Sequence, residues 1–136
     1  MAKKKAKPRP KTKAKWKERI IEQMKTVGTY NEAFDSSIDT LADIIDQREK
    51  AYAEFLANGG EACFEHISDR GAVNIKKNPR LQVWQDLNTQ ALAYWRDMGL
   101  TPAGLKKLNE AALKTEKAGS ALDEAVKAMV KELGGA

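Results

Sequence analysis

The residues from Glu32 to Ala57 carry a hydrophobic repeat that is typical of a long amphipathic helix. The repeat has intervals of three and four residues, which place its members on one side of a helix. Its apolar members are Phe34, Ile38, Leu41, Ile45, Tyr52 and Phe55, and Arg48 takes the one polar position. Asn31 is the expected N-cap, and Asn58-Gly59-Gly60 is the expected stop. A helix on the order of 40 Å long needs a partner to cover its apolar side.

A second repeat, from Pro79 to Met98, provides that partner. Its members are Leu81, Trp84, Asn88, Ala91, Trp95 and Met98. Two long amphipathic helices joined by a short segment predict an antiparallel helical hairpin. The register that brings the two polar positions together sets Arg48 opposite Asn88 and Tyr52 opposite Trp84. A polar pair inside an apolar interface costs stability but specifies the alignment.

Shorter elements flank this hairpin. Residues 16–27 predict a helix whose Trp16 docks on the body. A further helix is expected to begin at Thr101-Pro102, with Leu105, Leu108 and Ala112 on its apolar face. Residues 61–78 are the least regular part, where Gly71 to Ile75 predicts a small hairpin or a loop. The fold class expected is all-α: a long antiparallel helical hairpin with short flanking helices and a disordered basic N-terminal tail.

We expect three parts along the chain. Residues 1–15 form a disordered basic arm, and residues 16–113 form a helical core that contains the hairpin. Residues 114–136 form a polar linker, up to Gly119, and a C-terminal amphipathic helix. The apolar face of that last helix consists of Leu122, Val126, Met129 and Leu133.

Charge is distributed very unevenly. The net charge of the 136-residue chain is +5. Residues 1–19 hold ten Lys or Arg against one acid, a balance of 10 − 1 = +9, so the remainder holds 14 basic and 18 acidic residues, or −4. The positive charge therefore belongs to the N-terminal arm, and the body is mildly acidic. Asp35, Asp39, Asp43 and Asp46 lie at helical spacing and predict a solvated acidic face, with a metal ion or a basic partner as the alternative.

An arm of this kind is typical of binding to nucleic-acid phosphates, with release of counterions. A second, smaller basic cluster flanks the turn at Asn78-Pro79. The candidate DNA-binding residues are Lys3, Lys4, Lys5, Lys7, Arg9, Lys11, Lys13, Lys15, Lys17 and Arg19 in the arm, and Lys76, Lys77 and Arg80 in the cluster.

The sequence contains no set of residues that predicts catalysis. It has no phosphate-binding glycine loop, and Cys63 and His66 have no second ligand or acid partner nearby. We therefore expect a binding protein that is not an enzyme and has neither cofactor nor metal. No apolar run reaches the roughly 20 residues of a membrane span. No apolar stretch follows the basic N-terminus, so we expect no secretory signal. The single cysteine fits a reducing compartment.

The order of these features resembles the small terminase subunit of tailed bacteriophages, in the HK97-like group. The resemblance covers about residues 30–110 and rests on Ala51-Tyr52, Asn58-Gly59-Gly60, Gly71, Asn78-Pro79 and Met98-Gly99-Leu100-Thr101-Pro102. The last stretch is close to the family's Leu-Gly-Leu-Thr-Pro. After it, Ala103-Gly104-Leu105-Lys106 departs from the small residue and Arg usual in the family, and the Gly-Asn-Pro-Gly of many family N-terminal arms is missing.

The resemblance implies a homo-oligomeric ring in the host cytoplasm that binds double-stranded viral DNA at the packaging start and works with a large subunit. We expect the segment after Gly119 to engage that large subunit and to be dispensable for ring assembly. Two alternatives stay open: a coiled-coil adaptor whose basic tail binds RNA or an acidic partner, and a nucleoid-type protein that compacts DNA without sequence preference.

Overall fold

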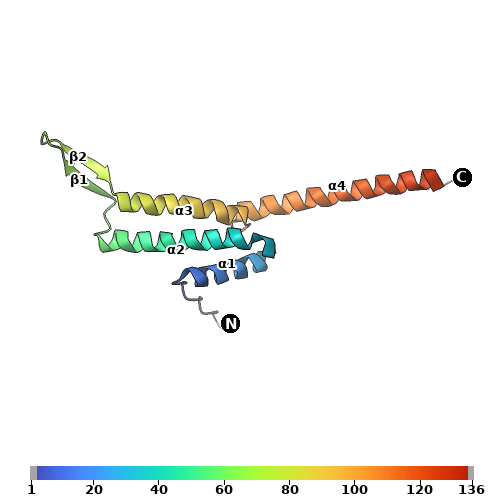
Figure 1. Ribbon diagram of the computed structural model, residues 1–136, viewed down its shortest axis with the longest axis horizontal. Helices are drawn as coiled ribbons and strands as arrows, with labels where there is room; N and C mark the ends of the chain where they lie inside the picture. The colour runs from blue at the N-terminus through green and yellow to red at the C-terminus, as the bar shows by residue number, and fades with distance from the viewer. Residues whose placement is uncertain (1–2, 135–136) are drawn as a thin grey trace.

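The computed structural model describes residues 3–134 and is mostly helical. The elements in chain order are α1 (Lys13–Val27), the 3-10 turn η1 (Glu32–Phe34), α2 (Asp35–Ala57), β1 (Cys63–Ile67), β2 (Val73–Lys77), α3 (Pro79–Asp97) and α4 (Pro102–Gly134). The helix α2 lies between α1 and α3, and α2 and α3 run in opposite directions (Figure 1). The two strands project from one end of this three-helix body, and α4 projects from the other (Figure 1).

Local capping residues explain where the helices begin and end. The side chain of Thr12 accepts a hydrogen bond from the backbone N–H of Lys15, so α1 starts three residues before Trp16, the predicted start. Asn31 caps η1, which leads directly into α2. At the other end of α1, Gly28 has a φ of 81°, a left-handed conformation that glycine adopts without strain.

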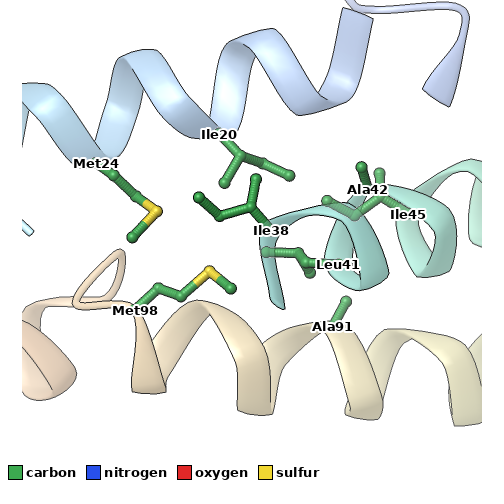
Figure 2. Packing of buried hydrophobic residues seen from close by; sticks show 8 residues of the cluster. All are labelled: Ile20, Met24, Ile38, Leu41, Ala42, Ile45, Ala91 and Met98. Atoms are coloured by element: carbon green, nitrogen blue, oxygen red, sulfur yellow. The ribbon is translucent and has the colours of Figure 1, made fainter. Parts of the chain in front are cut away.

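The core is one small cluster where α1, α2 and the end of α3 meet. Its buried members are Ile20, Met24, Ile38, Leu41, Ala42, Ile45, Ala91 and Met98, shown in Figure 2. Trp16 is partly buried and packs against this cluster, as the sequence predicted. The hydroxyl of Thr29 donates a hydrogen bond of 2.8 Å to the carbonyl of Met98, which ties the chain after α1 to the end of α3.

The contact between α2 and α3 has the predicted register. The guanidinium of Arg48 donates a hydrogen bond of 2.8 Å to the side-chain oxygen of Asn88. One helical turn further along α2, the ring of Tyr52 lies 5.5 Å from that of Trp84, centroid to centroid. Both expected pairs are therefore confirmed.

The fold is mostly helical, as expected, but it is not strictly all-α, because residues 63–77 form a two-stranded antiparallel sheet. Of the two possibilities that the sequence left for this segment, a small hairpin or a loop, the structure has the hairpin. Strand β1 pairs with β2 in a register that sets Cys63 opposite Lys77 and Ile67 opposite Val73. The turn between the strands is closed by a hydrogen bond of 2.8 Å from the N–H of Gly71 to the carbonyl of Ser68. Every residue of both strands is exposed, so no buried face generates a strong alternation in the sequence.

The polar segment 114–119 is helical, so the predicted linker is wrong as secondary structure. Helix α4 runs without a break from Pro102 to Gly134. Lysine, glutamate and alanine between Lys114 and Ala118 are all good helix formers, and a single interior glycine, Gly119, costs only about 1 kcal/mol relative to alanine. At the start of α4, the hydroxyl of Thr101 accepts a hydrogen bond from the N–H of Gly104, as expected for an N-cap.

Candidate nucleic-acid interface

The lysines at the start of α1 face the acidic side of α2. Lys13 lies 3.2 Å from Asp39 and 3.9 Å from Asp43, nitrogen to oxygen. Lys17, one turn later, lies 3.1 Å from Asp35 and 3.6 Å from Asp39. The aspartates that the sequence predicted to be a solvated face therefore serve in part as counter-charges for α1.

The arm before α1 folds back over the same two helices. Lys7 is paired with Glu22 of α1, and Arg9 is paired with Glu49 of α2. Arg19 donates a hydrogen bond of 2.7 Å to the carbonyl of Pro8, which holds the arm against α1. Part of the arm's charge is thus already balanced within the protein.

These pairs shift the pKa values of their members in the directions expected for attraction. A hydrogen bond from Lys13 lowers the pKa of Asp39, and a hydrogen bond from Lys7 lowers the pKa of Glu22. The hydrogen bond to Asp35 raises the pKa of Lys17. All of these groups are open to solvent, so salt or a competing anion weakens the pairs.

Among the described residues, the other predicted arm residues do not pair with α2 or with the arm itself. Lys15 pairs with Glu18 at 3.3 Å along the surface of α1. Within residues 3–134, Lys3, Lys4, Lys5 and Lys11 are exposed and take part in no ion pair. The structure therefore divides the ten predicted arm residues into a group engaged with the body and a group of four that are free to meet phosphates.

The second predicted cluster lies where the strands meet α3. Asn78 is buried and organises this junction: its side chain accepts from the N–H of Arg80 at 3.0 Å and donates to the carbonyl of Glu61 at 2.9 Å. The ammonium of Lys77 donates to Gln85, and the guanidinium of Arg80 lies 3.8 Å from Glu54. Of the three predicted residues, Lys76 is exposed and makes no ion pair within the described part of the chain.

The two basic regions lie on different elements of the structure. The cluster with Lys76 sits at the end of the body that carries the strands, whereas the arm lies alongside α1 (Figure 1). A ligand that contacts both must therefore be extended, as a nucleic-acid duplex is.

Sequence reasoning missed one face of the strand pair. The register sets Phe64 opposite Lys76 and His66 opposite Asn74, so these four side chains share a face. Arg70 lies in the exposed turn between the strands. A two-stranded ribbon that carries donors, a cation and an aromatic ring has the dimensions and chemistry to enter a DNA groove. The sequence signal for this face was the short run from Cys63 to Ile67, which forms β1. It is much weaker than the periodic patterns of the helices on either side.

No metal site or membrane span is found in the described part. Residues 3–134 contain no group of three or more His, Cys, Asp or Glu side chains that could hold a metal ion. Among the same residues, no helix is both long enough and apolar enough to cross a bilayer.

Comparison with known proteins identifies the family. A family model described as the phage terminase small subunit matches residues 12–114, from the cap of α1 into α4. Neither the curated proteins nor the solved structures yield a match. Because the matched region is most of the chain, the protein belongs to the small-subunit family of phage terminases.

Proposed function

We propose that this protein is a non-catalytic DNA-packaging subunit that binds duplex viral DNA at the packaging start as a homo-oligomeric ring and recruits or regulates the large terminase subunit. Its family places it in phage DNA packaging, which takes place in the host cytoplasm. The DNA contact, the ring and the large subunit as partner are the proposal.

One observation carries the DNA-binding part: within residues 3–134, four of the ten predicted arm charges are in no ion pair and five are paired with carboxylates of the protein. DNA phosphates can occupy the free lysines directly. They can also replace Asp39 or Glu22 as partners of Lys13 or Lys7, because an exposed ion pair is worth only about 0–1 kcal/mol. Release of counterions from the duplex then favours the complex.

The arm and the strands have different tasks in this proposal. Lysine contacts to phosphates position DNA but carry little sequence information. The face with Phe64, His66, Asn74 and Lys76 carries groups that can reach base edges. We assign affinity to the arm and choice of the packaging site to the strand pair.

The experiment removes arm charge without disturbing α1. Because Thr12 caps α1, substitutions stop at residue 11: Lys3, Lys4, Lys5, Lys7, Arg9 and Lys11 are all changed to Gln. The matched control changes six lysines of α4 to Gln, namely Lys106, Lys107, Lys114, Lys117, Lys127 and Lys131. Duplex binding is measured across a salt series by fluorescence anisotropy, and oligomer mass by native mass spectrometry.

We expect the arm variant to keep its oligomer mass and to lose most of its affinity. If about half of the ten arm charges engage at once, the intact protein has a log–log salt slope of roughly −4 to −5 per bound arm, and the variant has a flatter one. The α4 control should change much less. Unchanged affinity in the arm variant overturns the arm as the main DNA contact, and equal affinity for packaging-start and random duplexes favours a nucleoid-type role.

A further inference from the structure

Helix α4 is a long element with almost nothing packed against it. It spans 33 residues and leaves the body after its first turns (Figure 1). Large apolar side chains nevertheless continue to its end, with Leu122 at 65% and Leu133 at 84% of full exposure. Apolar side chains this exposed along one helix mark an interaction surface.

The exposed residues belong to a single unbroken repeat. Because α4 has no linker, the two apolar sets that the sequence suggested for separate helices share one register. Positions alternate by three and four residues along the whole helix: Leu105, Leu108, Ala112, Thr115, Gly119, Leu122, Val126, Met129 and Leu133. A repeat of 3.5 residues keeps facing a partner only when the partner is another helix in a left-handed supercoil. This pattern favours a second copy of α4 as that partner.

Small residues widen the apolar face. If Leu105 is taken as position a of a heptad, Ala111, Ala118 and Ala125 all fall at position g. A stripe at a, d and g is broader than the a/d seam of a two-stranded coiled coil. Each α4 can therefore contact a neighbour on both sides, as subunits of a ring require.

Charge selects the parallel arrangement. Glu116 and Asp123 fall at position e. In a parallel bundle position e of one helix faces position g of the next, which here is alanine. In an antiparallel pair the e positions face each other, and these acids would repel. The parallel arrangement also leaves every three-helix body at the same end.

We infer that α4, from Leu108 to Leu133, associates with α4 of other copies of this chain in a parallel bundle, and that ring assembly depends on this contact. This inference deepens the oligomeric part of the proposed function and rests on it. It replaces the role expected from the sequence alone, in which the segment after Gly119 was dispensable for assembly and engaged the large subunit.

The test places charge inside and outside the repeat in the full-length protein. One variant combines Leu122→Glu with Met129→Glu, both at position d. The matched control combines Leu113→Glu with Ser120→Glu, both at position b; it adds the same charge and also removes an exposed leucine, since Leu113 is 51% exposed. Mass is measured by native mass spectrometry and light scattering over a concentration series. Tryptophan fluorescence checks that the three-helix body stays folded.

We expect the d-position variant to fall to monomers, or to need at least tenfold more protein to assemble, while the b-position control keeps the mass of the unmodified protein. A monomeric unmodified protein would overturn both the proposed ring and this inference. If the unmodified protein is a ring and the d-position variant keeps the same mass, the inference fails while the ring stands. Loss of large-subunit binding in that same variant would then assign the stripe to the large subunit.

Orientation is tested by cross-linking, with Cys63 replaced by Ser. Ala112→Cys and Val126→Cys lie seven residues to either side of Gly119. In a parallel bundle each variant forms disulfides with itself under mild oxidation. An antiparallel pair centred on Gly119 would form them only in a mixture of the two variants, which would overturn the parallel arrangement.

Discussion

Arg48 of α2 and Asn88 of α3 are joined by a hydrogen bond of 2.8 Å across the middle of the helix pair. The guanidinium also lies 5.2 Å from the centre of the Trp95 ring, at a distance typical of a cation–π contact. It also lies 3.0 Å from the carboxylate of Glu49, nitrogen to oxygen. The side chain of Arg48 is only 13% exposed, so its charge depends on these three neighbours. The pair sets the alignment of α2 against α3.

The first prediction concerns this pair. Asn88→Leu should destabilise the protein by about 2 kcal/mol, because a partly buried charge loses one of its two side-chain acceptors and keeps only Glu49. Adding Arg48→Met should recover most of that loss, since the pair is then apolar and Glu49 keeps its ion pair with Arg9. Urea unfolding of the single and double variants measures both effects. Simple additivity of the two single changes would contradict the coupling.

The second prediction compares the effects of replacing two glycines of α4, Gly104 and Gly119, by alanine. A Cβ at Gly104 would lie 2.1 Å from the carbonyl oxygen of Arg96, so Gly104→Ala must displace α4 from the end of α3. We expect it to lower stability by about 1–3 kcal/mol. A Cβ at Gly119 meets nothing within 4 Å, and Gly119→Ala should raise stability by up to about 1 kcal/mol through helix propensity. Thermal unfolding followed by circular dichroism should show opposite signs; two shifts of the same sign would refute this account.

The third prediction concerns the carboxylates that hold α1. Asp39→Asn with Asp43→Asn releases Lys13, so duplex affinity at low salt should rise roughly two- to fivefold. Glu110→Gln with Glu124→Gln changes the net charge equally on α4 and serves as the control. Anisotropy titrations compare the two variants. An equal gain in both would mean that only net charge matters.

The fourth prediction concerns pH. Asp39 has a lowered pKa, so its pair with Lys13 contributes stability above the ordinary value of 3.8 and loses it as the pH falls through the lowered value. Lys17 has a raised pKa, so its pairs contribute below 10.5 and weaken as the pH rises through the raised value. Between about pH 5 and 9 the contact of α1 with α2 should be constant. Carboxyl-carbon NMR should find the Asp39 pKa below 3.8, and Lys13→Gln should bring it back toward that value; an unshifted Asp39 would argue against the pair in solution.

The fifth prediction separates site choice from affinity. Lys76→Gln with Asn74→Ala alters the exposed face of the strands. We expect a modest loss of affinity for all DNA and a roughly three- to tenfold loss of preference for packaging-start over random duplexes. Lys106→Gln with Ser120→Ala on α4 is the control. A preference that survives in the strand variant would place site choice elsewhere in the body.

The long helices and their register followed from the sequence because their signals are local and periodic. Spacings of three and four residues identify a helical face, and one polar position in each repeat was enough to pair Arg48 with Asn88. Caps such as Thr101 act within one turn, so they too could be read from the chain.

Only the tertiary structure decided how charges and exposed faces are used. The lysines of α1 meet the aspartates of α2 because the core residues Ile20 and Ile38 dock the two helices in one particular rotation, and no local pattern specifies that rotation. The sequence left residues 61–78 open between a small hairpin and a loop, because all side chains of the strands are exposed and no core imposes alternation on them. The continuity of α4 joins two apolar sets into one repeat, since cooperative helix formation carries the chain through Gly119.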